Sequence, residues 1–139
     1  MYVCGNEQTM IQENKLRVGN LLNYQTAEGD VVNLTTDFHA IKWATEDPKG
    51  FNLVHSPIPI TEEWLIKFGF KQYNDFGVKF NTFDLMPLCG FGYDIDTKQV
   101  VILEKGNPNS HWIERKIEYV HELQNLYFAL RGQELTPLH

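Results

Sequence analysis

The hydrophobic residues near the C-terminus repeat with the spacing of an α-helix. From Ile117 to Arg131 the chain reads IEYVHELQNLYFALR. At about 100° per residue, one side of that helix carries a continuous apolar stripe. The stripe consists of Tyr119, Val120, Leu123, Leu126, Tyr127 and Leu130. It predicts a helix that packs on the core, and Gly132 is well suited to the left-handed position that follows a helix end.

Phe128 interrupts this pattern, because it projects from the opposite side of the helix. Its neighbours on that side are His121, Gln124 and Asn125. A large aromatic side chain in polar surroundings indicates that the face is covered by another part of the chain or contacts a partner. Phe128, His121 and Asn125 are therefore candidate contact residues on the outer face of the helix.

Short apolar and β-branched runs predict strands in the first part of the chain. They cover 16–24, 31–35, 37–45 and 51–55. The run 37–45 also fits a short helix, but its alternating pattern favours a strand. Residues 27–30 and 46–50 have the composition of turns. Strands this short and this close together predict a small curled sheet, like a miniature barrel.

A short helix over 62–68 has clear boundary signals. Thr61 is a suitable N-cap, Glu62 and Glu63 lie where the helix dipole favours anions, and Gly69 is placed to end the helix. A helix of this length is too short to be stable alone. We therefore expect tertiary packing to hold it.

The pattern returns to strands after this helix, at 70–73, 78–83, 91–95 and 99–104, with 111–116 as a hairpin partner. A rival interpretation places one helix from 111 to 131, capped by Ser110, and strand followed by helix is preferred. The predicted fold class is α+β, with a small antiparallel, partly barrel-like sheet, one short helix and one longer C-terminal helix. A single domain is expected over 16–135, after a flexible N-terminus over 1–15.

The composition and charge of the chain limit the kinds of partner that it can bind. The chain has 139 residues, a formal charge of −6 and a pI near 5.3, so long-range attraction to nucleic-acid phosphates is absent and nucleic-acid binding is unlikely on this ground. Lys and Arg are scattered, and only Arg115 and Lys116 are adjacent. No run reaches the roughly 20 apolar residues of a membrane span. With no signal-peptide pattern and only Cys4 and Cys89, we expect reduced thiols in the cytoplasm of a cell.

The sequence offers no recognisable catalytic or metal-binding motif. The five His residues never stand four apart, and neither Cys has a C-x-x-C partner, so no metal is expected. Gly90-Phe91-Gly92 precedes a strand, whereas a phosphate loop needs a helix N-terminus there. Cys89 has no identifiable base, and a buried structural thiol is the better interpretation. We expect neither enzymatic activity nor a cofactor.

Aromatic residues are dense between positions 68 and 93. Those in this stretch are Phe68, Phe70, Tyr73, Phe76, Phe80, Phe83, Phe91 and Tyr93. Most should belong to the core. Aromatic side chains left over on a sheet face could stack on a base or line a subunit interface. A homo-oligomer is therefore possible from the sequence.

Three blocks of the sequence resemble known proteins. They read LRVGNLL from Leu16, SPIPITEEWLIKFGF from Ser56, and YVHELQNLYFALRGQEL from Tyr119. Together they resemble a group of short uncharacterised proteins carried by bacteriophages, prophages and mobile elements of Bacteroidota. The resemblance spans roughly 16–135, with a divergent middle. It implies a phage-related gene product that acts in the bacterial cytoplasm, and it brings no functional residues.

The leading functional hypothesis is a phage-derived, non-enzymatic binding protein. It would sequester a host nucleotide signal or a host protein, for example in counter-defence. Phosphate contacts would come from Arg115, Lys116 and Arg131. The alternative is a nucleic-acid-binding accessory module that stacks single strands on the N-terminal sheet. An enzyme that uses His55 or His111 with a carboxylate is a third hypothesis, which no residue spacing supports.

Overall fold

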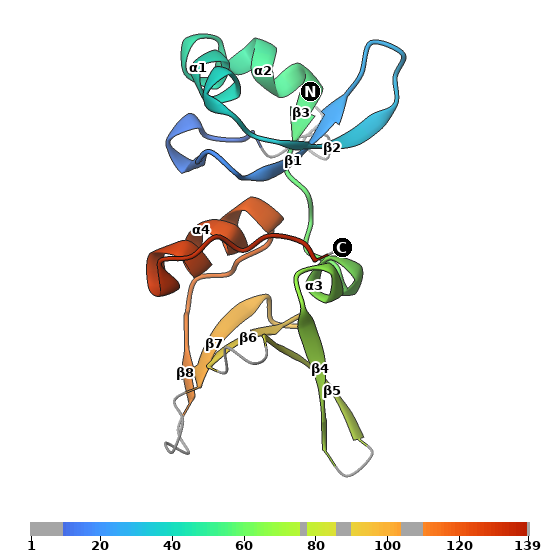
Figure 1. Ribbon diagram of the computed structural model, residues 1–139, viewed down its shortest axis with the longest axis vertical. Coiled ribbons are helices and arrows are strands. Elements are labelled where there is room, and N and C mark those ends of the chain that lie inside the picture. The colour runs from blue at the N-terminus through green and yellow to red at the C-terminus, as the bar shows by residue number, and fades with distance from the viewer. Residues whose placement is uncertain (1–9, 76–77, 86–89, 104–109, 139) are drawn as a thin grey trace, which may run out of the picture. The chain divides into compact units, whose positions relative to one another are not determined.

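The computed structural model describes residues 10–75, 78–85, 90–103 and 110–138 (Figure 1). The chain divides into two compact units. Unit 1 comprises Met1–Pro59 and Tyr119–Glu134, and unit 2 comprises Ile60–Glu118 and Leu135–His139. Each unit has its own antiparallel sheet. The single domain over 16–135 stays a prediction.

Unit 1 is built on a three-stranded sheet. Its strands are β1 (Leu21–Gln25), β2 (Val31–Thr35) and β3 (His55–Ser56), in the order β2-β1-β3. β1 and β2 form a hairpin in which the Thr26 N–H donates to the Asp30 carbonyl at 2.8 Å. The predicted strand 31–35 is confirmed. Of the predicted strand 16–24 only the end is a strand, because residues 16–20 form a loop that contains the short 18–19 turn.

The predicted strands 37–45 and 51–55 are wrong, because helices α1 (Phe38–Glu46) and α2 (Pro48–Val54) occupy all of these residues except Asp37, which caps α1, and His55, which begins β3. Asp37 caps α1 by accepting from the Ala40 N–H at 2.9 Å. Asp47 caps α2 by accepting from the Gly50 N–H at 3.1 Å, with Pro48 in the first turn. Both are standard helix-start signals. They outweigh a short alternating pattern.

One hydrophobic cluster of unit 1 joins the two helices to strand β1. Its buried members are Ile11, Leu16, Leu22, Ala44 and Phe51. The short 3₁₀ helix η2 (Glu13–Lys15) lies between Ile11 and Leu16 in the chain. Because the outer strands β2 and β3 pair with β1 and not with each other, the sheet is not closed, and the predicted barrel-like character is wrong.

The long C-terminal helix α4 (Val120–Arg131) confirms the strongest sequence prediction, although it begins three residues later than the stripe suggests. The Ile117 N–H instead donates to the Lys98 carbonyl at 2.7 Å, and Tyr119 forms a bridge with Pro59. Gly132 ends the helix with a φ of 70°. Its N–H donates to the Phe128 carbonyl at 2.8 Å, as the left-handed cap requires.

Unit 2 is a five-stranded antiparallel meander with the short helix α3 (Glu62–Lys67). Its strands, in their order across the sheet, are β4 (Phe70–Asp75), β5 (Val78–Leu85), β6 (Phe91–Asp94), β7 (Gln99–Leu103) and β8 (Ser110–Trp112). The predicted strands 70–73, 78–83, 91–95 and 99–104 are confirmed with small boundary shifts, whereas of the predicted strand 111–116 only residues 111 and 112 lie in β8. Because β8 is a strand, the rival helix over 111–131 is wrong.

Local signals position α3 as expected. Thr61 accepts from the Trp64 N–H at 3.3 Å, and Gly69 takes a φ of 96°. The aromatic residues around it supply the core rather than a free sheet face. Those that are buried are Phe68, Phe70, Phe83, Phe91 and Tyr93. The side chains of Tyr73, Phe76 and Phe80 lie outside the described residues.

Gly92 in β6 is required by packing, which supports the backbone interpretation of Gly90-Phe91-Gly92. A Cβ at this position would lie 2.6 Å from Asp84 Oδ1 and 2.9 Å from Val101 Cγ1. Cys4 and Cys89 lie outside the described residues. The fold class α+β is confirmed, with two antiparallel sheets and four α-helices in the described part of the chain.

Candidate functional site

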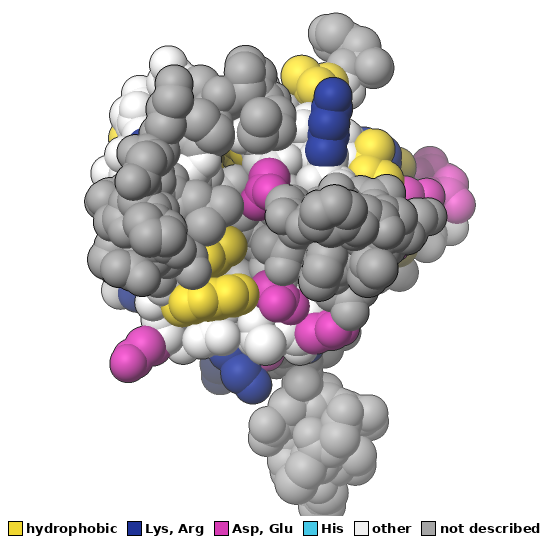
Figure 2. Space-filling view, turned by 90° about the horizontal axis from the view of Figure 1, so that it is seen from below, with side chains coloured by type: hydrophobic (Ala, Val, Ile, Leu, Met, Phe, Trp, Pro, Cys, Tyr) yellow, Lys and Arg dark blue, Asp and Glu magenta, His cyan; other side chains and the backbone are white. Residues whose placement is uncertain are grey.

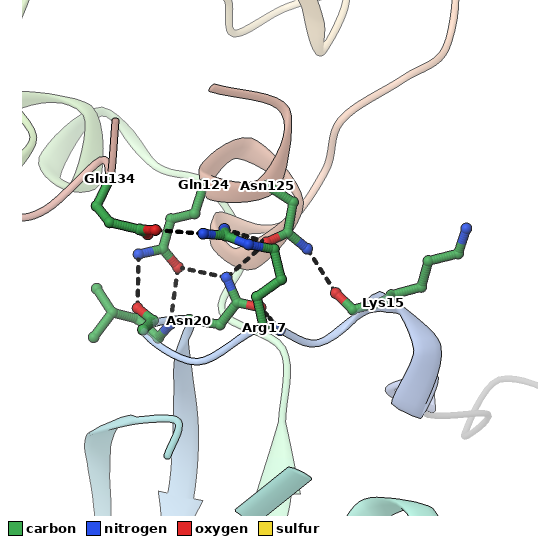
Figure 3. Close-up of polar contacts among 8 residues, drawn as sticks. Lys15, Arg17, Asn20, Gln124, Asn125 and Glu134 are labelled. Atoms are coloured by element: carbon green, nitrogen blue, oxygen red, sulfur yellow. Dashed lines mark hydrogen bonds and ion pairs between the residues drawn. The ribbon is translucent and has the colours of Figure 1, made fainter. Parts of the chain in front are cut away.

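A cluster of polar side chains attaches helix α4 to the loop before β1 within unit 1 (Figure 3). Gln124 is buried at its centre. Its Oε1 accepts from the Leu21 N–H at 2.8 Å, and its Nε2 donates to the Gly19 carbonyl at 3.2 Å. The amide of one helix residue therefore satisfies two backbone groups of a segment about a hundred residues earlier.

Asn125, one of the predicted contact residues, is fully engaged in the same cluster. Its Oδ1 accepts from Asn20 Nδ2 at 2.9 Å and from Arg17 Nη1 at 3.0 Å. Its Nδ2 donates to the Lys15 carbonyl at 2.6 Å. Asn125 therefore positions neighbouring groups, and Arg17 is the cationic group that it helps to fix.

Arg17 is held from three directions. Its guanidinium carbon lies 4.1 Å from the centre of the Phe128 ring. Nη1 donates to Asn125, and Nη2 forms an ion pair with Glu134. The side chain of Arg17 is 29% exposed and that of Glu134 is 43% exposed. An ion pair this exposed stabilises the fold by at most about 1 kcal/mol, so the Glu134 carboxylate is readily exchanged.

The predicted contact residues do not share one exposed face. Phe128 is 39% exposed and lies against Arg17, whereas His121 is only 5% exposed. The expectation that His121 lies on the outer face is wrong, because α4 buries two sides rather than one. Of the two alternatives for this face, the structure shows coverage by another part of the same chain, residues 15–21, which run from the end of η2 through the loop 16–20 to the start of β1.

The three predicted phosphate-binding cations divide between the units. Arg131 is exposed in the last turn of α4 in unit 1. Arg115 and Lys116 are exposed after β8 and belong to unit 2. Their role as phosphate contacts stays a prediction.

The residues that sequence reasoning missed are Arg17, Asn20, Gln124 and Glu134. Arg17 stands in a run that looks like a strand. Nothing local marks it, since its partners lie 108 and 117 residues away. Phe128 is the one signal that could have led to this cluster, because an aromatic side chain on a polar helix face often carries a guanidinium.

Two buried histidines in unit 1 have altered electrostatics. His55 stacks on Phe51 with ring centres 3.8 Å apart, and its Nδ1 lies 2.8 Å from the Phe51 carbonyl. Burial lowers the pKa of His55, partly offset by this hydrogen bond. Burial also lowers the pKa of His121, and the Glu122 charge opposes that shift. Both imidazoles are therefore expected to be neutral near pH 7.

The two histidines have different surroundings. His55 packs among Tyr24, Trp43 and Phe51. Nδ1 of His121 has no hydrogen-bond partner among the described residues, and its ring is stacked with Tyr119 at 6.2 Å. His111, the other histidine considered for catalysis, has its side chain outside the described part of the structure.

Surface charge is mixed where it can be seen. Figure 2 shows both Lys or Arg and Asp or Glu side chains on the described part of this face. Within the described ranges, no group of three or more His, Cys, Asp or Glu side chains is placed to hold a metal ion. The helices in the described part of the chain are all too short or too polar to cross a membrane.

Comparison of this chain with known proteins does not assign it to a family. The resemblance to short phage-borne proteins rests on its three sequence blocks and stays a prediction. No protein-family model matches this chain, and neither a curated protein nor a solved structure matches it.

Proposed function

We propose that the chain is a non-enzymatic binding protein that recognises an anionic ligand at Arg17, beside the partly exposed side chain of Phe128. The observation that supports this proposal is the fixed position of the Arg17 guanidinium. Asn125 and Phe128 hold it in place without a ligand. A cation fixed in advance loses little side-chain entropy on binding, so more of its interaction energy contributes to affinity.

Glu134 indicates which chemical group Arg17 would bind. Its carboxylate contacts Nη2 of Arg17, and it follows Gly132, outside the helix. Guanidinium groups bind carboxylates and phosphates through the same paired N–H groups. A ligand phosphate would therefore replace Glu134 and occupy the position that its carboxylate occupies here.

Phe128 favours a ligand that also carries a planar ring. Phe128 is 39% exposed and its ring lies 4.1 Å from the guanidinium carbon of Arg17, so an anion bound to Arg17 would place its adjoining groups near an aromatic side chain. A nucleotide combines a phosphate with a flat base, and bases stack on aromatic side chains with about 1–3 kcal/mol each. A host nucleotide is accordingly the proposed ligand, and a host protein segment with an acidic side chain is the second choice.

The origin and setting of this activity rest on the resemblance alone. A phage-derived protein that sequesters a host nucleotide would act in the host cytoplasm and could oppose host defence. No described residue favours this cellular setting over a different one. The binding chemistry at Arg17 is the part of the proposal that can be tested directly.

The test is isothermal titration calorimetry of the full chain with mononucleotides, cyclic dinucleotides, inorganic phosphate and a single-stranded oligonucleotide. Arg17→Ala should weaken nucleotide binding roughly 10- to 100-fold, the value of a charge-assisted hydrogen bond. Arg17→Lys should weaken it less, and Glu134→Gln should strengthen it, because the competing charge is removed. Lys42→Ala, which removes an exposed cation of α1, is the matched control.

These variants also separate binding from a purely structural role of the cluster. If Arg17 serves only to attach α4 to the loop, Glu134→Gln should lower the melting temperature and should not raise the affinity for any of these ligands. The proposal is wrong if no compound binds the wild-type chain, or if folded Arg17→Ala binds as well as wild type. Binding of the oligonucleotide alone would favour the accessory-module hypothesis.

A further inference from the structure

Strand β2 lies at one edge of its sheet, and no other described strand pairs with its outer side. Among the described strands it pairs only with β1, and Val31 and Val32 are 64% and 44% exposed. The strand reads VVNLT and has no charged residue, proline or bulge, which are the usual features that protect an edge strand from pairing with another chain.

The hydrogen bonds of the hairpin show which backbone groups face outward. The Thr26 N–H donates to Asp30, and the Thr36 N–H donates to Asn20. Both bonds join even-numbered residues, in register with the pair Leu22 and Leu34. Because hydrogen-bonded pairs alternate along an antiparallel ladder, the odd-numbered residues of β2 direct their N–H and C=O groups away from β1. These residues are Val31, Asn33 and Thr35.

We propose that β2 pairs antiparallel with β2 of a second copy of this chain, about a twofold axis at Asn33. The axis places Asn33 opposite its own copy and Val31 opposite Thr35 of that copy. All of these residues have outward-facing backbone groups, so the hydrogen-bonding register of the two strands matches. The result is one continuous sheet built from both copies, and this inference is independent of the proposed function.

The side chains are also complementary across this axis. Val32 meets Leu34 of the other copy, an apolar pair of the kind that stabilises neighbouring strands. The flanking acids do not oppose each other, because the axis sets Asp30 opposite Thr36 and Asp37 opposite Gly29. A second copy therefore fits this edge without a direct charge conflict, even though each chain carries a formal charge of −6.

The area of contact limits the strength of the pair. Strands of five residues are about 17 Å long and bury far less surface than the roughly 1,200–2,000 Å² of stable complexes. We therefore expect reversible dimers that become more abundant as the protein concentration rises. High salt should favour them, because it screens the repulsion between two acidic chains.

The test places opposite charges on the axis. Asn33→Lys alone sets two ammonium groups against each other, and Asn33→Asp alone sets two carboxylates against each other. Sedimentation velocity over a concentration series should show dimers for wild type, monomers for either variant, and recovered dimers when the two variants are mixed. Thr45→Lys on the exposed surface of α1 is the control and should dimerise like wild type.

Three results would overturn the inference. Wild type could stay monomeric at every concentration, both variants could dimerise as wild type does, or their mixture could stay monomeric. Circular dichroism shows whether each variant is folded. If the charged variants unfold, Val31→Pro replaces them, because a proline is tolerated at the first residue of an edge strand. It removes one outward N–H, so it should reduce dimerisation, and unchanged dimerisation would contradict the pairing.

Discussion

Replacement of Gln124 by leucine should destabilise the fold far more than its place on a polar helix face suggests. The leucine keeps a similar volume but removes both ends of the amide. The Leu21 N–H then loses its acceptor, and the Gly19 carbonyl loses its donor. A buried backbone group without a partner costs about 1–3 kcal/mol. We expect the free energy of unfolding to fall by roughly 2–4 kcal/mol, since the added apolar surface offsets part of the loss.

Urea denaturation followed by far-UV circular dichroism measures this difference, with Gln133→Leu as the control. Gln133 is exposed just after α4, so its replacement should change the free energy of unfolding by less than about 0.5 kcal/mol. A loss for Gln124→Leu as small as that of the control would refute the argument. It would mean that the loop over 15–21 and α4 do not depend on each other.

The remaining predictions concern pH, packing and capping. Because the pKa values of His55 and His121 are lowered in the fold, the unfolded chain binds more protons below about pH 6.5, and stability should fall between about pH 7.5 and pH 5.5. Urea midpoints that do not change over this range would count against neutral buried imidazoles. Gly92→Ala should cost about 1–3 kcal/mol, because its Cβ would lie 2.9 Å from Val101 Cγ1; an unchanged melting temperature would contradict that contact. Asp37→Ala should cost about 1 kcal/mol through loss of the α1 cap. Asp37→Asn should restore most of it, and equal losses for the two variants would argue against a capping role.

The sequence predicts those parts of the fold whose signals are local. Thr61 and Gly69 mark both ends of α3, and glycine also marks the end of α4. The strands of unit 2 are separated by turn residues, so their positions could be predicted. The same local chemistry was present at Asp37 and Asp47. There the alternation of a few apolar residues favours strands, but the two caps begin helices α1 and α2.

The candidate site depends on contacts that no local pattern shows. The spacing of apolar residues predicts which side of the helix faces the core, but it gives no reason for the polar residue Gln124 to be buried. That reason is the unpaired N–H of Leu21 and carbonyl of Gly19, supplied by a loop more than a hundred residues earlier. Phe128 could be selected from the sequence because it interrupts a polar helix face. Its partner Arg17 could not, because the side chains that fix it lie 108 and 117 residues away in the sequence.

The most direct test of anion recognition is a nuclear magnetic resonance titration that observes the Nε–H signal of Arg17. The titration uses the nucleotide that binds most tightly by calorimetry. The chemical shift of this signal should change during the titration and stop changing at the ligand-to-protein ratio that calorimetry gives. The backbone amide of Glu134 should shift with it, as its carboxylate leaves the guanidinium. A nucleotide that saturates the protein while both signals stay unchanged would contradict the proposal and place the binding site elsewhere.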